Sequence, residues 1–229
     1  HDDYDEYIYC KSIIFKHQKS DDIVILNQDN DITRQLRESV QSKAYMFSMN
    51  EKYDKENSVN GAYLHDNAIY VNIDKNIKRM LDVNDIKIPG RHNIENYMAA
   101  ILATYSLVEQ AAVKHVSTTF NGVEHRVEYV RTVNGVRFYN DSIGTTPSRT
   151  VASLHCFDKK VILIAGGYDK NISYDIMGPL INEKVKGLVL MGQTKEKIKQ
   201  AYTDYSCTAT LCEASTMEEA VRKAFNMAE

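Results

Sequence analysis

The sequence has no apolar run long enough to cross a membrane and no large excess of either charge. A membrane-spanning helix needs about 20 consecutive apolar residues, and nucleic acids and anionic membranes attract strongly basic surfaces. The 229 residues carry 28 Lys and Arg against 31 Asp and Glu, which gives a formal net charge of −3. The first residues are charged and polar, so no signal peptide is visible. We therefore expect a cytoplasmic protein without nucleic-acid or membrane partners.

Cysteine is scarce, and its spacing fits no metal or redox motif. The four cysteines are Cys10, Cys156, Cys207 and Cys212, and no pair has Cys-x-x-Cys spacing. That spacing is typical of zinc sites and dithiol redox centres. We expect reduced, mostly buried thiols.

A phosphate-binding loop is also absent. No GxxxxGK[ST] segment occurs in the chain, so the chain has no loop of its own to cradle the β- and γ-phosphates of a nucleotide. The chain begins with His1 rather than Met, and it stops in a helical pattern where an alternating α/β fold would normally add a strand. We expect both ends to be cut.

Apolar periodicity in the first half predicts helices and short strands. Residues 4–18 follow the i, i+3, i+4 spacing of a helix, and residues 23–26 form the continuous apolar run that is typical of a buried parallel strand. Further strands are predicted at residues 44–49, 61–64 and 68–73, the last two joined by a hairpin turn. A helical pattern then runs from Asn93 to about Thr118. A single helix of that length is unusual in a small domain, so we expect a break near Val108.

The second half opens with a hairpin signal. Asn134-Gly135 lies between β-rich runs at residues 127–133 and 136–140. Asn-Gly favours the tight turn whose twist matches that of paired strands. The sequence therefore predicts a β-hairpin at this point.

After the hairpin, helix and strand alternate. Pro147 is expected at the first position of a helix, with Thr146 as its cap. Strands are then predicted at residues 161–165, 187–191 and 208–211, and helices at residues 174–181, 194–202 and 217–227. This alternation predicts a parallel sheet with helices on its faces, so the fold class is α/β.

The first candidate site is the segment Gly90-x-His92-Asn93-x-x-Asn96. Asn93 is expected to cap a helix, and Asn96 follows on the same face one turn later. Carboxamides both donate and accept hydrogen bonds, which suits the edge of a purine. A capped helix with a buried Asn is the simpler interpretation of the same spacing.

The second candidate site combines His125-Arg126 at the start of one predicted strand with Asp141 at the end of the next. An arginine there can reach a phosphate, a histidine can contact a base, and a carboxylate can bind ribose hydroxyls. Alternatively, the first pair forms surface ion pairs and Asp141-Ser142 is ordinary turn chemistry. Together with the first site, these residues predict a nucleotide held across a domain seam.

The third candidate site is the loop Gly166-Gly167-Tyr168-Asp169-Lys170. It follows the strand that we expect to be the best buried one, and open α/β sheets bind ligands at the carboxyl ends of their strands. The glycines allow close approach of a ligand to the backbone, and Lys170 would offer a cation to a carboxylate or phosphate. An ordinary loop with a solvated lysine remains the alternative.

Lys11 is unusual because it interrupts an apolar helical stripe. A lysine in this position usually extends its amine into solvent. The alternative is carbamylation, which would turn the cation into a carboxylate able to ligate Mg²⁺.

Taken together, the motifs resemble the Mur ligase family. They are GxHNxxNxxAAxxA from Gly90, GxxHRxE from Gly122, VNGVxFYNDS from Val133 and ILIAGGxDK from Ile162. Their order and spacing match the family over the whole chain. The resemblance is to the D-glutamate-adding members.

The resemblance implies two incomplete parts of a three-domain enzyme. Residues 1–123 would be the C-terminal part of the central, P-loop-type ATP-binding domain, and residues 124–229 most of the C-terminal Rossmann-like domain. The P-loop and the UDP-binding domain would lie outside this chain. The fragment itself is expected to be inactive and monomeric.

The resemblance also implies a role for each candidate residue in this sequence. Asn93, Asn96 and His125 would contact adenine, Asp141 the ribose and Arg126 the phosphates. Thr145 and Lys170 would bind D-glutamate, and Lys11 would be the carbamylated lysine near Mg²⁺. The roles assigned as catalytic are those of Lys11, Arg126 and Lys170.

Two features qualify this transfer of roles. Many family members have a lysine where this chain has Ile143, so a charge at that position is not expected here. His1 would be the last remnant of a metal-binding segment.

The reaction implied by the family is amide-bond formation driven by ATP and Mg²⁺. ATP would phosphorylate the carboxylate of UDP-N-acetylmuramoyl-L-alanine, and the amine of D-glutamate would attack the acyl phosphate. The alternatives are another Mur-type ligase, a folylpolyglutamate synthase-like enzyme, and a non-catalytic nucleotide-binding module.

Overall fold

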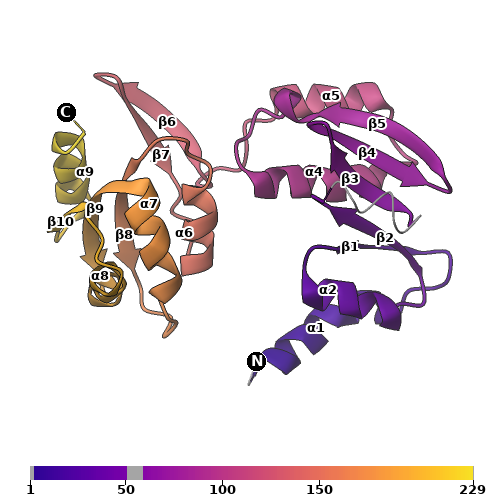
Figure 1. The fold of residues 1–229 in the computed structure, drawn as a ribbon, viewed down its shortest axis with the longest axis horizontal. Helices are drawn as coiled ribbons and strands as arrows, with labels where there is room; N and C mark the ends of the chain where they lie inside the picture. The colour runs from indigo at the N-terminus through magenta and orange to yellow at the C-terminus, as the bar shows by residue number, and fades with distance from the viewer. Residues whose placement is uncertain (1–2, 51–58, 229) are drawn as a thin grey trace. The chain divides into compact units, whose positions relative to one another are not determined.

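The structure is a computed structural model that describes residues 3–50 and 59–228. The chain forms two compact units, unit 1 (His1–Asn121) and unit 2 (Gly122–Glu229). Figure 1 shows the helices and strands of each unit. No helix in the described part of the chain is long and apolar enough to cross a membrane.

Unit 1 is a mixed sheet with helices on both faces. Its elements are α1 (Tyr4–Lys16), β1 (Ile23–Asn27), α2 (Asp31–Leu36), η1 (Arg37–Ser39), β2 (Lys43–Ser48), β3 (Gly61–His65), β4 (Ala68–Ile73), β5 (Asn76–Asp82), η2 (Val83–Asp85), α4 (Arg91–Thr104) and α5 (Gln110–Thr119). The sheet order is β1-β2-β3-β4-β5. The first three strands pair in parallel, and β3, β4 and β5 pair antiparallel.

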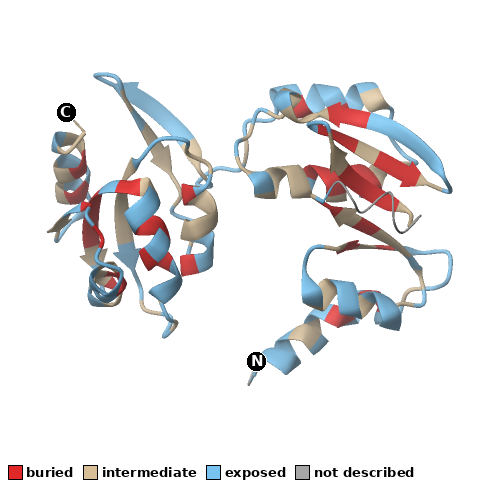
Figure 2. Ribbon diagram, viewed as in Figure 1, coloured by how far each residue is buried: buried red, intermediate tan, exposed pale blue. Residues whose placement is uncertain are grey.

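The alternation of side chains along the strands divides the core of unit 1 into two layers. Ile69 and Val71 of β4 pack with Met98 and Leu102 of α4, whereas Tyr70 packs in the layer that holds Phe15 of α1. Successive strand residues point to opposite faces, so one strand contributes to both layers. Figure 2 shows this burial along the central strands and along α4.

Unit 2 combines a hairpin with a parallel sheet. Its elements are β6 (Glu128–Val133), β7 (Val136–Asn140), α6 (Pro147–Leu154), β8 (Val161–Gly167), η3 (Asp175–Met177), α7 (Gly178–Lys184), β9 (Val185–Gly192), α8 (Lys195–Asp204), β10 (Thr210–Glu213) and α9 (Met217–Asn226). The parallel sheet has the order β10-β9-β8, and β6 pairs antiparallel with β7.

The central strand β9 has both faces covered. Leu188 and Leu190 pack in the core that includes α7 and α8, while Val189 packs against Ala220 and Ala224 of α9. All three strand residues are fully buried. Both faces are apolar because each is covered by a helical layer, which is typical of parallel sheets.

Most of the predicted elements are confirmed. The hairpin at Asn134-Gly135 forms, and both residues have the positive φ that its tight turn requires (48° and 81°). The long helical pattern breaks between Thr104 and Gln110, which confirms a break near Val108. Pro147 is the first residue of α6, but Thr146 caps it without a side-chain bond to the helix.

The burial predicted for two strands is wrong, and two elements were not predicted. β1 pairs in parallel with β2, as predicted, but its expected burial is wrong: it forms the edge of the described sheet, Ile23 is exposed, and buried positions alternate with more open ones. β8 is only half-buried, and β9 is the most buried strand of its sheet. The sequence did not predict α2 or β5, because one is a single short helix and the other carries polar residues along most of its length.

The cysteines are free thiols, but the expected burial is wrong for most of them. Cys207 is buried, whereas Cys10, Cys156 and Cys212 are half-buried. Burial raises the pKa of both Cys156 and Cys207 above the usual value for a thiol.

Candidate functional site

In unit 1, the candidate amides lie in the first turns of α4. Gly90 occupies the N-cap with φ of 105°, and α4 begins at Arg91. Asn93 therefore lies inside the helix, and the prediction that it caps the helix is wrong. A glycine takes the cap because its backbone there needs a positive φ.

The two amides are nevertheless on one face, as predicted. Asn93 Nδ2 donates to the Pro89 carbonyl oxygen at 2.6 Å, and Asn96 Nδ2 donates to Asn93 Oδ1 at 3.3 Å. Asn96 is exposed. No residue in the described ranges engages the Asn96 carboxamide oxygen, which leaves an acceptor open beside the amino groups.

Glu95 lies between these amides in sequence and is half-buried. Its burial, with a smaller contribution from the negative charge of Asp29, raises the pKa of Glu95 above its usual value. Asp29 follows β1, and its carboxylate accepts from Ser48 Oγ and from the Met49 backbone N–H, both at 2.7 Å. The start of α4 is therefore electrostatically coupled to the carboxyl ends of β1 and β2. The sequence analysis did not predict this coupling.

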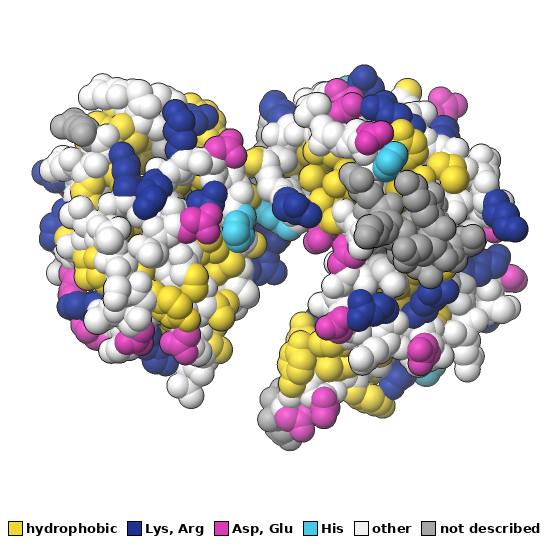
Figure 3. All heavy atoms as spheres, in the orientation of Figure 1, with side chains coloured by type: hydrophobic (Ala, Val, Ile, Leu, Met, Phe, Trp, Pro, Cys, Tyr) yellow, Lys and Arg dark blue, Asp and Glu magenta, His cyan; other side chains and the backbone are white. Residues whose placement is uncertain are grey.

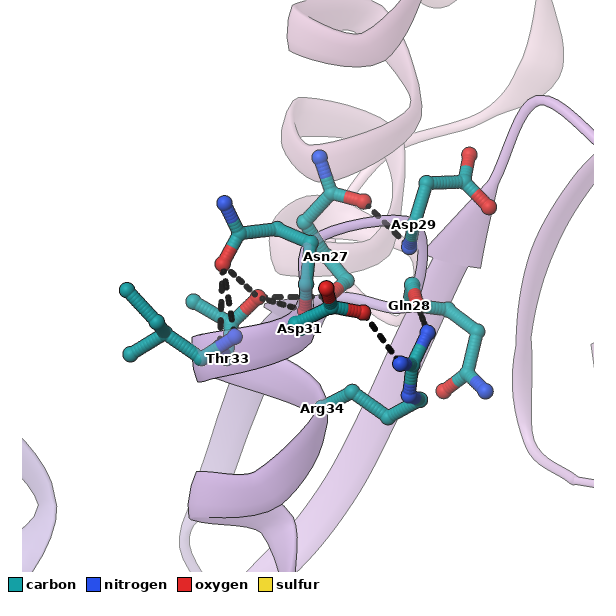
Figure 4. A network of polar contacts seen from close by, with 8 residues as sticks. Asn27, Gln28, Asp29, Asp31, Thr33 and Arg34 are labelled. Carbon is teal, nitrogen blue, oxygen red and sulfur yellow. Dashed lines mark hydrogen bonds and ion pairs between the residues drawn. The ribbon is translucent and has the colours of Figure 1, made fainter.

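The turn between β1 and α2 is held by side-chain caps (Figure 4). Asn30 Oδ1 accepts from the backbone N–H groups of Ile32 and Thr33, both at 3.1 Å. Asn27 Oδ1 accepts from the Asp29 N–H at 2.8 Å, and Thr33 Oγ1 donates to the Asn27 carbonyl oxygen at 2.6 Å. Arg34 pairs with Asp31 on the exposed side of α2.

Lys11 lies beside this turn, in a hollow of about 380 Å³. The polar residues that share its lining are Asn27, Asn30 and Thr33. The oxygens of both asparagines accept backbone N–H groups of the turn, and their amino groups form no bond among the described residues. An amide N–H can donate to an anion such as a carbamate on Lys11.

The apolar side of the Lys11 hollow is formed by α1 and α2. Lys11 Nζ lies 5.4 Å from the centre of the Tyr7 ring, and Tyr4 and Ile8 also line the hollow. Figure 3 shows hydrophobic side chains gathered over this part of the visible face. Lys11 is exposed, as expected for a lysine that extends its amine into solvent.

Metal-binding residues do not cluster in the described ranges. No group of three or more His, Cys, Asp or Glu side chains in residues 3–50 and 59–228 could hold a metal ion. A carbamylated Lys11 would supply one carboxylate, whereas Mg²⁺ prefers octahedral oxygen coordination. These residues by themselves do not fit a complete Mg²⁺ site. His1 lies outside the described residues.

In unit 2, the structure brings the turn before β6 together with the turn after β7. Asn140 Nδ2 lies 2.9 Å from His125 Nδ1, and the Val127 N–H donates to Asp141 Oδ1 at 3.1 Å. The Ile143 N–H donates to the His125 carbonyl oxygen at 3.2 Å. We call this group (residues 125, 127, 140, 141 and 143) the twin-turn cluster. It places His125 and Asp141 together, as predicted.

The position of His125 and Arg126 differs from the prediction in one respect. β6 begins at Glu128, so both residues lie in the preceding turn rather than in the strand. His125 has φ of 65°, and its backbone N–H donates to Glu128 Oε2 at 2.8 Å. The side chain of Arg126 is exposed, and among the described residues it forms no ion pair. It is therefore open to an external anion.

Thr145 and Lys170 are exposed and are not brought together by any described bond. Thr145 lies in the turn before α6, where its N–H donates to the Ile143 carbonyl oxygen at 2.9 Å. Ile143, the family's lysine position, is half-exposed and uncharged.

The glycine loop after β8 approaches the neighbouring strand closely. Gly166 has φ of 131°, and a Cβ there would overlap the Met191 carbonyl oxygen, whereas a Cβ on Gly167 would meet open space. Asp169 pairs with Lys197 at 2.8 Å. That lysine, together with the Asn171 N–H, holds the pKa of Asp169 below its usual value. The loop is fixed by Asp169 and leaves Lys170 free to face solvent.

Sequence analysis missed Asn140 as a site residue. The sequence pattern assigns a role to Asp141 but none to Asn140, the residue before it. An asparagine directly before a predicted site carboxylate, at the end of a hairpin strand, is the signal that could have drawn attention to it.

These observations define the class of the protein. It is a two-unit mixed α/β protein with polar candidate residues at helix starts and at the carboxyl ends of strands, where open α/β sheets bind ligands. Residues 1–104 match the family model "Mur ligase middle domain", and residues 125–229 match "Mur ligase, glutamate ligase domain". The chain belongs to the Mur ligase family.

Curated relatives align with the whole chain. It is 43% identical over 233 residues to a UDP-N-acetylmuramoylalanine–D-glutamate ligase of Clostridium botulinum (strain Kyoto / Type A2) and 42% identical over 234 residues to one of Acetivibrio thermocellus. Each alignment covers 100% of this chain and 49% of the relative. The chain thus spans about half the length of the curated relatives it matches.

Solved structures share the fold at low sequence identity. MurF from Acinetobacter baumannii superposes with a TM-score of 0.68 at 18% identity, covering 98% of this chain and 50% of that one. A folylpolyglutamate synthase of Mycobacterium tuberculosis gives 0.65 at 10% identity, covering 97% and 52%. At such identities the likeness concerns the fold alone.

Proposed function

We propose that this chain is part of an ATP-dependent ligase that adds D-glutamate to UDP-N-acetylmuramoyl-L-alanine in peptidoglycan precursor synthesis. The observation that carries the proposal is the identity of 42–43% over the whole chain to ligases with that name. ATP would activate the substrate carboxylate as an acyl phosphate, and the amine of D-glutamate would displace phosphate to form the amide.

The proposal assigns each unit to a part of such an enzyme. Unit 1 is the C-terminal part of the central P-loop-type ATP-binding domain, and unit 2 is the Rossmann-like glutamate ligase domain. The parallel pairing of β8, β9 and β10 with helices on both faces supports the second assignment. The protein would work as a monomer in the cytoplasm, where ATP is available.

In unit 1, Asn93 and Asn96 are proposed to contact adenine. The open carboxamide oxygen of Asn96 can accept from the exocyclic amine of the base, and the neighbouring amide can donate to a ring nitrogen. The bond between the two side chains supports this role, because it holds both amides together on one face of α4.

In unit 2, the twin-turn cluster is proposed to contact the same cosubstrate. His125 would hydrogen-bond the base, and Asp141 would bind the ribose hydroxyls. Arg126, which is exposed and unpaired among the described residues, would bind phosphate as a catalytic cation. Thr145 and Lys170 would bind D-glutamate, with the lysine facing a carboxylate of the amino acid.

Lys11 is proposed to be carbamylated and to act near Mg²⁺. Asn27 and Asn30 line its hollow, and their amino groups support an anionic modification because each can donate to it. No group of three or more His, Cys, Asp or Glu side chains in the described residues could hold the ion, so Mg²⁺ would need further ligands.

A substitution at Lys11 tests this role. In a protein that carries this chain at the full length of its relatives, Lys11→Ala should lower kcat by at least about tenfold, because a positioned charge near a phosphoryl group contributes on that order or more. Short carboxylic acids should restore part of the activity. Lys16→Ala, on the same helix over the Tyr9 ring, is the matched control. Unchanged activity of Lys11→Ala would contradict the proposed role and favour the alternative that Lys11 is an ordinary solvated lysine.

Substrate specificity is tested with the same protein. It is incubated with ATP and UDP-N-acetylmuramoyl-L-alanine, and phosphate release is measured for D-glutamate, L-alanine, L-lysine, diaminopimelate and D-alanyl-D-alanine in turn. Release with D-glutamate alone is expected. Release with a different amino acid would favour another Mur-type ligase, and release with none would favour a non-catalytic nucleotide-binding module. The 229-residue chain alone should release no phosphate.

A further inference from the structure

Asn140 joins the turn after β7 to the imidazole of His125. Its Nδ2 lies 2.9 Å from His125 Nδ1, and its Oδ1 accepts the Ser142 backbone N–H at 3.1 Å. The Asn140 carboxamide thus contacts the Ser142 N–H, which can only donate, and His125 Nδ1, which can donate or accept depending on the tautomer. The orientation of the carboxamide determines whether Nδ1 donates or accepts.

The backbone contact fixes which end of the carboxamide faces the ring. The Ser142 N–H is a donor only, so the Asn140 atom beside it must be the oxygen. The amino group then faces His125. This assignment follows from hydrogen-bond chemistry, which is how oxygen and nitrogen of an amide are distinguished.

The amino group in turn fixes the proton on the ring. An N–H pointed at Nδ1 requires Nδ1 to accept, and a neutral imidazole that accepts at Nδ1 carries its proton on Nε2. The competing group is the Glu128 carboxylate, which would favour a proton on Nδ1. Its Oε2 lies 3.5 Å from Nδ1, beyond good hydrogen-bond distance, and is already bonded to the His125 backbone N–H at 2.8 Å.

The rest of the twin-turn cluster holds the His125 backbone independently of Asn140. The Ile143 N–H bonds the His125 carbonyl oxygen, and Asp141 Oδ1 accepts the Val127 N–H. The imidazole is about half exposed (53%), and no described residue engages its Nε2. The nitrogen left for a ligand is therefore the one that carries the proton.

We propose that Asn140 is a positioning residue that holds His125 as the Nε2–H tautomer, so that the ring presents a hydrogen-bond donor to an acceptor atom of the nucleotide. The role toward a nucleotide rests on the proposed function; the tautomer does not. The opposite tautomer would present an acceptor and would repel the same ligand atom.

Long-range ¹H–¹⁵N NMR of the histidine rings tests the tautomer in the 229-residue chain. The spectra are recorded at a pH where the imidazoles are neutral, and His125 is assigned from a His125→Gln variant. In the wild type, Nδ1 should be the unprotonated nitrogen and Nε2 the protonated one. The reverse, or an even mixture, would overturn the proposal.

Two variants sharpen the test. Asn140→Asp keeps the shape and still accepts from Ser142, but it offers an acceptor to Nδ1, so the proton should move to Nδ1. Ser142→Ala keeps its backbone N–H and is the matched control, which should leave the wild-type pattern. An unmoved proton in Asn140→Asp would contradict the proposal. If that variant does not fold, the wild-type spectrum alone tests the proposed tautomer of His125.

Steady-state kinetics test the role of Asn140 in nucleotide binding, in a protein that carries this chain and has the full length of its relatives. Asn140→Asp should raise KM for ATP about tenfold with a smaller change in kcat, since a donor is replaced by a mismatched acceptor. An unchanged KM alongside the expected NMR result would overturn the role in nucleotide binding. An inactive wild type would instead contradict the proposed function and leave the NMR result standing.

Discussion

Unit 1 and unit 2 hold their candidate side chains by different means. In unit 1, Asn93 and Asn96 stand on α4, whose buried residues Met98 and Leu102 anchor the helix to the sheet. In unit 2, His125 and Asp141 stand in two turns that are joined by bonds between side chains and backbone. Helix packing positions the first pair, and a local hydrogen-bond network positions the second.

This difference predicts how each site responds to substitutions. A helix anchored by an apolar face tolerates changes among its exposed polar residues, because these contribute little to its packing. A network of turns depends on each donor meeting its acceptor, since an unmatched polar group costs more than a formed bond contributes. Substitutions in unit 2 should therefore disturb geometry as well as contact.

The largest expected effect tests whether the units unfold separately. Gly166→Ala should destabilise unit 2 by about 3 kcal/mol or more, because the new methyl overlaps the Met191 carbonyl oxygen and the backbone has a positive φ. Hydrogen exchange measured by mass spectrometry should show faster exchange in unit 2 only.

Two glycine variants serve as controls for that result. Gly167→Ala has a similar backbone but open space around the methyl, so it should cost only about 1–2 kcal/mol. Gly61→Ala, whose methyl would overlap the Met46 carbonyl oxygen, should perturb unit 1 instead. Faster exchange in both units from either change would show that they unfold together.

A smaller effect is expected from helix caps. Thr216 accepts the Glu219 N–H at 3.2 Å at the start of α9, whereas Thr146 makes no cap bond to α6. Thr216→Ala should cost about 1 kcal/mol in urea unfolding. Thr146→Ala should cost less, and Asn30→Ala should give a loss similar to Thr216→Ala in unit 1, since Asn30 caps α2. Equal losses for the two threonines would contradict the assigned cap geometry.

The smallest expected effect is the acid sensitivity of unit 2. Hydrogen bonds from Lys199 and Lys195 lower the pKa of Glu213 from its usual 4.5 to about 2. Because the folded-state pKa is the lower one, the stabilisation is complete above about pH 4.5 and is lost as the pH falls toward 2. The Glu213 side chain is more than a third exposed (37%), so solvent screening weakens the effect.

Urea unfolding at successive pH values checks this prediction. The wild-type midpoint should fall slightly more between pH 4.5 and 2 than that of Glu213→Gln, which lacks the titrating group. Parallel pH profiles for the two proteins would show that Glu213 does not contribute to the acid sensitivity of unit 2.

The sequence predicted the parts of each unit that follow from periodicity and turn chemistry. α4 and its amide face follow from the spacing of apolar residues and from Asn93 to Asn96, and the β6–β7 hairpin follows from Asn134-Gly135. The twin-turn cluster was predicted only in part. Its bonds depend on which backbone N–H meets which oxygen across fourteen or more residues, and spacing does not encode that.

The errors have equally physical causes. Gly90 caps α4 in place of Asn93 because its backbone has a positive φ, which residue type alone does not reveal. The Lys11 hollow depends on Asn27 and Asn30, whose oxygens are used as caps only once α2 forms. A short helix of this kind carries too few residues for periodicity to indicate it.

The central claim is that a protein carrying this chain joins D-glutamate to UDP-N-acetylmuramoyl-L-alanine. The most direct test uses a protein that carries this chain and has the full length of its relatives. It is incubated with ATP, UDP-N-acetylmuramoyl-L-alanine and D-glutamate labelled with ¹⁵N at its amine, and the product is analysed by mass spectrometry. The account predicts a product that retains the label in a new amide bond, with no product from labelled L-glutamate. Phosphate release without incorporation of the label would contradict it.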